Sequence, residues 1–135
     1  MRSNFSTLCI GTCFFCTLHV SAQPKFAWDI TLGGDGYEEF NVLCPMTDCL
    51  YMGGSSPSNI AFGNPADNSY NFLIFKTDLN GNLLWQTMFG GDQTERLWAF
   101  APISDGALVA GGYSQSGVSG DKTEPSRGGK DVWFQ

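Results

Sequence analysis

The cysteines are the residues whose spacing most directly suggests chemistry. Cys13 and Cys16 are separated by two residues, which is the spacing of thiol–disulfide redox motifs. Such motifs function beside a βαβ unit, and no pattern of that kind surrounds this pair. The pair also lies in an N-terminal segment that we expect to be removed, as do Cys9 and His19, the single histidine. The sequence therefore predicts no redox site here.

Acidic side chains gather at two points, each just after a Gly-Gly pair. They are Asp35, Glu38 and Glu39 in the first half and Asp92 and Glu95 in the second. Two carboxyl groups can hydrolyse a glycosidic bond when their separation and a raised pKa suit that reaction. The sequence shows neither property, so surface charge is the simpler interpretation. A Ser-His-Asp or Cys-His set is excluded for residues 23–135, which contain no histidine. We assign no catalytic residue, and enzymatic activity is not predicted.

Two loops resemble ligand-binding motifs only in part. Asp78-Leu79-Asn80-Gly81-Asn82 has the polar spacing of a calcium loop, but no distant bidentate glutamate follows it. Gly33-Gly34-Asp35-Gly36 is as rich in glycine as a phosphate loop, but neither a helix nor a Gly-Lys-Ser/Thr motif follows. We interpret both as tight turns, and we predict no metal and no cofactor.

The four tryptophans could serve as platforms on which sugars stack. Trp28 and Trp85 occupy the same position of the repeat described below, so packing between repeats is the favoured interpretation for both. Trp98 and Trp133 stand where the first repeat has Asn41 and Leu73. A repeat position that varies is the better place to look for a ligand, although this signal is weak.

The first 22 residues have the features of a secretory signal peptide. Arg2 supplies positive charge, residues 5–20 are uncharged and mostly apolar, and Val20-Ser21-Ala22 is a cleavage pattern of small residues before Gln23. The apolar run is short against the roughly 20 residues that a spanning helix needs. Cys13 fits the acylation site of a lipoprotein poorly. We expect a secreted or cell-surface chain, and its formal net charge of −6 argues against nucleic acid and anionic membranes as partners.

The rest of the chain is organised as a repeat. The segment from Trp28 to Asp35, which contains Gly33-Gly34, returns 57 residues later as the segment from Trp85 to Asp92, which contains Gly90-Gly91. A second Gly-Gly pair, Gly53-Gly54, returns as Gly111-Gly112 with an offset of 58, and the match between residues 71–75 and 131–135 has an offset of 60. The offset grows only where turns and loops are expected, and loops tolerate insertions. A fixed period of this size indicates a repeat architecture.

Short apolar runs separated by glycine-rich turns predict an all-β fold, and no sustained helical spacing occurs. The predicted strands are Lys25–Leu32, Glu39–Cys44, Cys49–Gly53, Tyr70–Thr77, Leu83–Phe89, Glu95–Ala101, Ala107–Gly111 and Asp131–Gln135. Two long polar loops, Ser55–Ser69 and Gly112–Gly129, interrupt the series. Asn80-Gly81 is a strong hairpin signal.

Four short antiparallel strands per repeat are typical of a propeller blade. The motif Leu79-Asn80-Gly81-Asn82-Leu83-Leu84-Trp85, followed by Phe89-Gly90-Gly91, resembles the β-propeller repeats of large secreted proteins of Bacteroidetes-type bacteria. The resemblance covers residues 28–135 and implies blades without shared catalytic residues. The chain departs from those proteins because it has about two repeats and no C-terminal secretion-sorting domain.

The strand count divides the chain into three parts. Residues 1–22 are the signal, 23–84 the first blade repeat with a leading outer strand, and 85–135 a second blade repeat truncated before its last strand. Propellers typically have about four to eight blades, so two cannot close a ring. We expect either a fragment of a longer protein, the favoured alternative, or an assembly of several copies through open strand edges.

Cys44 and Cys49 flank the first hairpin turn, and a disulfide between them is predicted because secreted proteins reach an oxidising compartment. The second repeat has Ala101 and Ala107 at these places.

We predict a secreted binding or scaffold module. An extracellular ligand, glycan or protein, would bind the face that carries the two long loops and the acidic clusters. The alternative is a remnant or accessory module of a secreted hydrolase that acts on polysaccharide.

Overall fold

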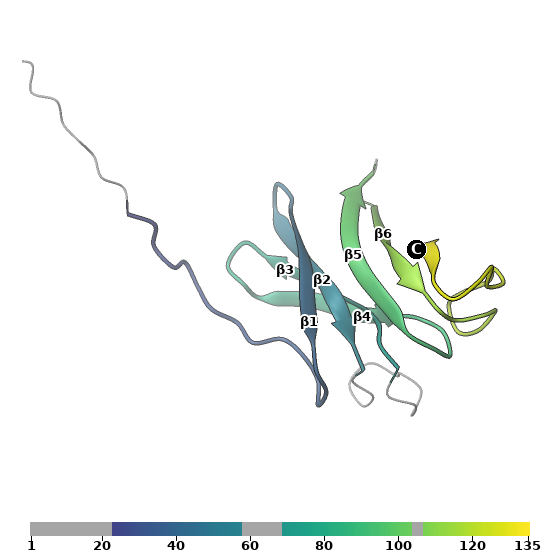
Figure 1. The fold of residues 1–135 in the computed structure, drawn as a ribbon. Helices are drawn as coiled ribbons and strands as arrows, with labels where there is room; N and C mark the ends of the chain where they lie inside the picture. Colours follow the sequence, from purple (N-terminus) through teal and green to yellow (C-terminus); the bar gives the residue numbers. More distant parts are fainter. Residues whose placement is uncertain (1–22, 58–68, 104–106) are drawn as a thin grey trace, which may run out of the picture.

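The computed structural model describes residues 23–57, 69–103 and 107–135. Within these ranges the chain forms seven strands and no helix, and so no helix that could cross a membrane. The strands build two open antiparallel sheets (Figure 1). The predicted class, an all-β chain with propeller-like blades that form an incomplete propeller, is confirmed. The predicted signal segment, the middle of the first long loop and the turn at 104–106 lie outside the described residues.

Sheet A contains four strands in the order β1-β2-β3-β4, and sheet B contains three in the order β5-β6-β7. Their bounds are β1 Glu39–Pro45, β2 Cys49–Ser56, β3 Asn71–Asp78, β4 Leu83–Phe89, β5 Glu95–Pro102, β6 Leu108–Ser114 and β7 Asp131–Phe134. All seven strands were predicted. β2 and β6 run further than predicted because each Gly-Gly pair remains paired with the strands on both sides.

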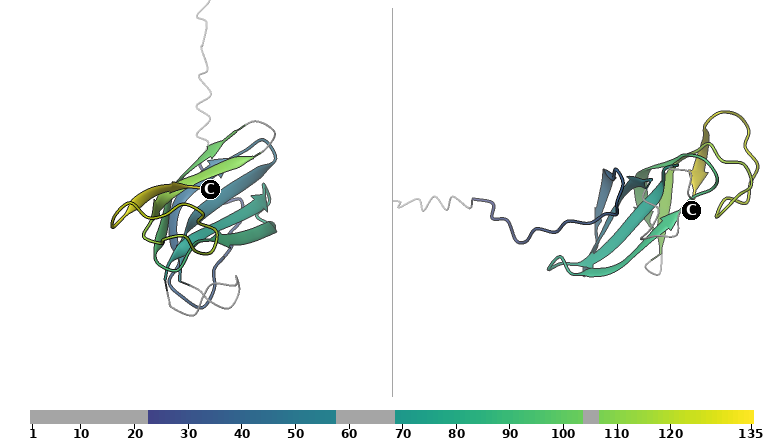
Figure 2. Two further views of the ribbon diagram at one scale, coloured as in Figure 1. Left: turned by 90° about the vertical axis from the view of Figure 1, so that its right-hand side faces the viewer. Right: turned by 90° about the horizontal axis from the view of Figure 1, so that it is seen from below.

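The predicted strand Lys25–Leu32 is wrong, because this segment is not part of either sheet. A strand exists only when a neighbour supplies backbone hydrogen bonds, and sheet A already has its four strands. The segment instead lies against the face of sheet A that points away from sheet B (Figure 2). The Trp28 indole Nε1 donates a hydrogen bond of 2.9 Å to the Leu79 carbonyl oxygen. Ile30 and Leu32 line a cavity of about 260 Å³ together with Leu73.

The hydrophobic core lies between the two sheets (Figure 2). Sheet A contributes Cys49, Tyr51, Phe72 and Ile74, and sheet B contributes Leu97, Ala110 and Trp133. The Phe72 and Trp133 rings pack with their centroids 4.9 Å apart. Strand side chains alternate between faces, so Leu73 and Phe75 lie on the other side of β3.

A β-bulge recurs at the same repeat position in both sheets. In β1 it falls between Phe40 and Val42, and in β5 between Leu97 and Ala99. The second glycine of each strand-borne Gly-Gly pair lies opposite the bulge. A Cβ atom at Gly54 would overlap the Glu39 carbonyl oxygen, and one at Gly112 would overlap the Arg96 carbonyl oxygen. The second glycine of each pair is therefore required by close backbone approach, while a Cβ at Gly53 or Gly111 would meet side chains.

Candidate functional site

The candidate site predicted from the sequence is the face where the long loops emerge. In the second repeat, the β4–β5 connection and the β6–β7 loop lie side by side on this face. Gly90 N donates to an Asp121 carboxylate oxygen over 3.0 Å, and Asp121 N donates to the Gly90 carbonyl oxygen over 2.8 Å. Asp92 N donates to Ser119 Oγ over 3.0 Å. The expectation that these two connections share one face is confirmed for the second repeat.

Glu95 does not contribute surface charge to this face, which corrects the interpretation of the acidic clusters. Its side chain is fully buried beneath the β6–β7 loop. The hydroxyls of Ser114 and Ser116 donate to one carboxylate oxygen over 2.7 and 2.6 Å. Gly91 N donates to the other over 3.0 Å. These bonds join both connections to β5, so Glu95 is a structural residue.

The first repeat contains part of the same arrangement. Glu38 is the counterpart of Glu95, and it accepts a hydrogen bond of 2.9 Å from Ser56 Oγ. Glu38 is half-buried where Glu95 is buried. Residues 58–68 of the loop beside Glu38 lie outside the described residues. The sequence carried a signal for this pair. A glutamate follows four residues after Gly33-Gly34 and after Gly90-Gly91, and β2 and β6 each end in a serine.

The β6–β7 loop is held in place by hydrogen bonds among its own residues and with Asp131. Lys122 is buried, and its Nζ donates to the Glu124 carbonyl oxygen. The Arg127 backbone N–H and the Ser126 hydroxyl donate to the Asp131 carboxylate and hold the pKa of Asp131 below its usual range. The loop and β7 border an open hollow of about 570 Å³, whose lining includes the charged residues Lys122, Glu124, Arg127 and Asp131.

Some of the four tryptophans pack against other residues, and others are exposed to solvent. Trp28 lies over the β3–β4 turn, where a Cβ at Gly81 would come within 2.6 Å of its ring. Trp85 is half-exposed and meets the Tyr51 ring edge-on at 5.8 Å. Trp133 is buried in the core, so it is not a stacking platform. Trp98 is 65% exposed on sheet B.

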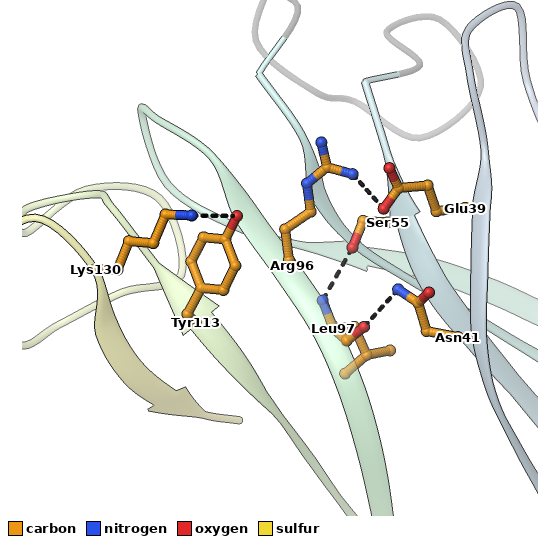
Figure 3. Close-up of polar contacts among 7 residues, drawn as sticks. All are labelled: Glu39, Asn41, Ser55, Arg96, Leu97, Tyr113 and Lys130. Carbon is orange, nitrogen blue, oxygen red and sulfur yellow. Dashed lines mark hydrogen bonds and ion pairs between the residues drawn. The ribbon is translucent and has the colours of Figure 1, made fainter.

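A second set of polar contacts, which sequence reasoning missed, joins the two sheets (Figure 3). Asn41 Nδ2 donates to the Leu97 carbonyl oxygen over 2.8 Å, and Leu97 N donates to Ser55 Oγ over 2.9 Å. Arg96 forms an ion pair with Glu39. The Leu97 groups lie at the bulge, where backbone bonding within sheet B is interrupted, so side chains of sheet A satisfy them.

The Asp78 carboxylate accepts hydrogen bonds from residues of its own turn. Oδ1 accepts from the backbone N–H groups of Asn80 and Asn82 over 2.8 and 2.9 Å, and Oδ2 accepts from the Asn82 amide over 2.8 Å. The bonds from the Asn82 side chain and backbone lower the pKa of Asp78. In the described part of the chain no three His, Cys, Asp or Glu side chains come together as metal ligands. The arrangement agrees with a tight turn.

Cys44 and Cys49 are free thiols in this structure. Both pack in or against the core between the sheets, on the same face of sheet A. Burial raises the pKa of the Cys49 thiol. The disulfide between them stays a prediction.

A scan against protein-family models finds none that matches this chain, and a search of curated proteins finds no match. The resemblance to secreted propeller repeats is therefore supported only by the motifs of the chain itself.

Proposed function

We propose that this chain is a secreted, propeller-type repeat module with a binding or scaffold role, and that its ligand binds at the β6–β7 loop. One observation carries the proposal: this long loop is built onto rigid strands by hydrogen bonds, yet its exposed side chains remain available. Thr123, Glu124 and Arg127 are exposed, while buried Ser116 and Lys122 fix the loop from beneath. Rigid strands that position a long polar loop are the usual layout of a recognition surface.

The burial of Glu95 changes which ligands are expected. The face keeps exposed acidic residues in Asp92, Asp121 and Glu124, and Arg127 offsets part of their charge. A mixed, polar surface favours neutral glycans or protein partners over polyanions. The alternative role, as part of a polysaccharide hydrolase, is weakened because Glu95 is bonded to serines and a backbone amide away from solvent.

Affinity electrophoresis of the exported protein through gels that contain neutral or anionic polysaccharides tests the proposal. We expect retardation by a neutral polysaccharide, and we expect the triple variant Thr123→Ala, Glu124→Ala, Arg127→Ala to lose it. That variant keeps the backbone bonds of the loop. Thr47→Ala, in the exposed turn at the opposite end of sheet A, should bind normally. Equal binding by the triple variant, or release of reducing sugar by the protein, would contradict the proposal.

Mass spectrometry of the exported protein tests the secretion step separately. The expected N-terminus is Gln23, since the cleavage pattern ends at Ala22. An intact Met1 on exported protein would refute the signal peptide.

A further inference from the structure

Three sulfur-containing side chains gather at the turn end of the β1–β2 hairpin (Figure 1). Cys44 lies near the end of β1, Met46 follows two residues later in the turn, and Cys49 is the first residue of β2. Cys49 is buried in the core between the sheets, and Cys44 and Met46 are half-buried and pack against that core. All three side chains therefore lie on the inner face of one hairpin.

The second repeat forms the same hairpin end without any sulfur. At the three corresponding positions it has Ala101, Ile103 and Ala107. Ile103 N donates to the Ala107 carbonyl oxygen over 3.0 Å, just as Met46 N donates to the Cys49 carbonyl oxygen over 2.8 Å. The sulfur atoms are therefore not needed to close the turn, and their presence in the first repeat points to a different role.

The strand register sets the spacing of the two thiols. Cys44 pairs with Tyr51, and the turn bond places Met46 opposite Cys49. Cys44 and Cys49 are therefore diagonal neighbours, a relation in which residues lie about 7–8 Å apart. A disulfide needs Cα atoms within about 6.8 Å of each other, so forming one would draw the strand ends together. A metal ion bonded to each thiolate at about 2.3 Å spans sulfur atoms up to about 4.6 Å apart and suits the wider spacing.

We propose that Cys44, Met46 and Cys49, with both thiols reduced, bind one soft monovalent cation, Cu⁺. Thiolate and thioether sulfur are the ligands that this ion selects. Zinc takes four ligands from thiolate, imidazole and carboxylate groups, and within the described residues no three such side chains come together. Cys44 and Met46 are partly exposed beside the turn, so the ion can reach the site without opening the core. A disulfide between the two cysteines would abolish the site.

Binding exchanges protons for the ion and transfers no electron. Each thiol loses its proton as its sulfur bonds to Cu⁺, and the thioether adds a lone pair, so the site gains one net negative charge. Lys76 pairs with Tyr51, and its ammonium lies 5.2 Å from the centroid of the Tyr51 ring. Burial raises the pKa of the Cys49 thiol, the charge of Lys76 lowers it, and Asp48 raises it. Lys76 is thus close enough to offset the charge of the loaded site.

Competition with a chromophoric Cu⁺ chelator tests the proposal on the reduced, exported protein under argon. We expect one ion per chain. The double variant Cys44→Ala, Cys49→Ala should bind at least about a hundredfold more weakly, and Met46→Ile about tenfold more weakly, because ligand number sets the affinity. These changes introduce the residue types of the second repeat. Met52→Ile is the matched control, because Met52 lines the cavity on the opposite face of sheet A and should leave binding unchanged.

Protection from alkylation gives a second readout that does not depend on the chelator. One equivalent of Ag⁺, which has the same charge and preference for sulfur and is not oxidised by air, should block alkylation of Cys44 in the folded chain. Circular dichroism of each variant checks that the sheets are intact. Binding by the unmodified chain no tighter than by the double cysteine variant would overturn the proposal. Equal affinities of Met46→Ile and Met52→Ile would overturn it too, because the thioether would then not be a ligand.

Discussion

The two repeats of this chain have the same backbone and different surroundings. Each sheet has a β-bulge at the same position, a glycine opposite the bulge, and a glutamate bonded to a serine at the end of the next strand. Yet Phe72 is buried between the sheets while its counterpart Val132 is exposed. The repeat sequence therefore specifies the blade itself, and whether a face is buried depends on what lies next to it.

Residues 26–32 and residues 83–89, which are counterparts in the repeat, differ in secondary structure. Residues 83–89 form β4, while residues 26–32 pair with no strand. Both segments have tryptophan at the same repeat position and end before a Gly-Gly pair. Their difference shows that a strand-like local sequence is not sufficient here, because a strand also needs a neighbour with which to pair.

The largest expected difference between the repeats is in core burial. Phe72→Ala should lower the free energy of unfolding by about 3–5 kcal/mol, because it leaves a cavity against Trp133. Val132→Ala, at the counterpart position, should change it by less than about 0.5 kcal/mol at concentrations where the chain is a single copy. Chemical denaturation of both variants measures the two values. Equal losses would show that the outer face of sheet B is also buried.

The glycines opposite the bulges should behave alike in both repeats. Gly54→Ala and Gly112→Ala should each cost about 2–3 kcal/mol, because the new Cβ overlaps a carbonyl oxygen and the bulge must shift. Gly117→Ala is the control, since nothing lies within 4 Å of a Cβ there. Thermal unfolding midpoints of the three variants measure these costs. If only one of Gly54→Ala and Gly112→Ala lowered the midpoint, the two repeats would not share the bulge.

Replacing the buried Glu95 should lower the free energy of unfolding more than replacing its half-buried counterpart, Glu38. Glu95→Ala leaves Ser114, Ser116 and Gly91 N without their acceptor beneath the loop, and should cost about 2–3 kcal/mol. Glu38→Ala should cost about 1 kcal/mol or less, because solvent reaches that site. Urea unfolding of the pair measures the difference. A larger cost for Glu38 would mean that the first repeat also encloses its glutamate.

The cysteine pair exists only in the first repeat. If Cys44 and Cys49 are bonded in exported protein, reduction should lower its stability by about 2 kcal/mol, the loop-closure effect of a short ring. Thiol titration of denatured, unreduced protein should then find no free thiol, and two free thiols would refute the bond. Where the thiols are free, Cys49 should be alkylated slowly in the folded state because it is buried and its pKa is raised.

The smallest expected effect is the loss of stability at low pH. The pKa of Asp78 is lower in the folded chain than in the unfolded chain, so its stabilising contribution is complete above the unfolded value of about 3.9. That contribution is lost as the pH falls through the folded value. NMR titration of the Asp78 carboxyl carbon should show a midpoint below the ordinary one, and Asp131 should do the same in the second repeat. An ordinary midpoint at Asp78 would contradict the turn geometry.

Local sequence signals were enough to predict the strands and their grouping into blades. Period-2 alternation, Asn80-Gly81 and the paired glycines are local signals, because each reflects the conformation of a few residues and their nearest neighbours. The seven strands of the structure were predicted on this basis; the ends of β2 and β6 were placed three residues too early, and the other bounds lie within one residue of the observed ones. Three features could be seen only in the folded chain: Lys25–Leu32 pairs with no strand, Glu95 is buried, and Asn41 and Ser55 bond to Leu97. Each depends on groups that lie far away in the chain or beyond its own sheet, and no local pattern encodes which neighbour will be present.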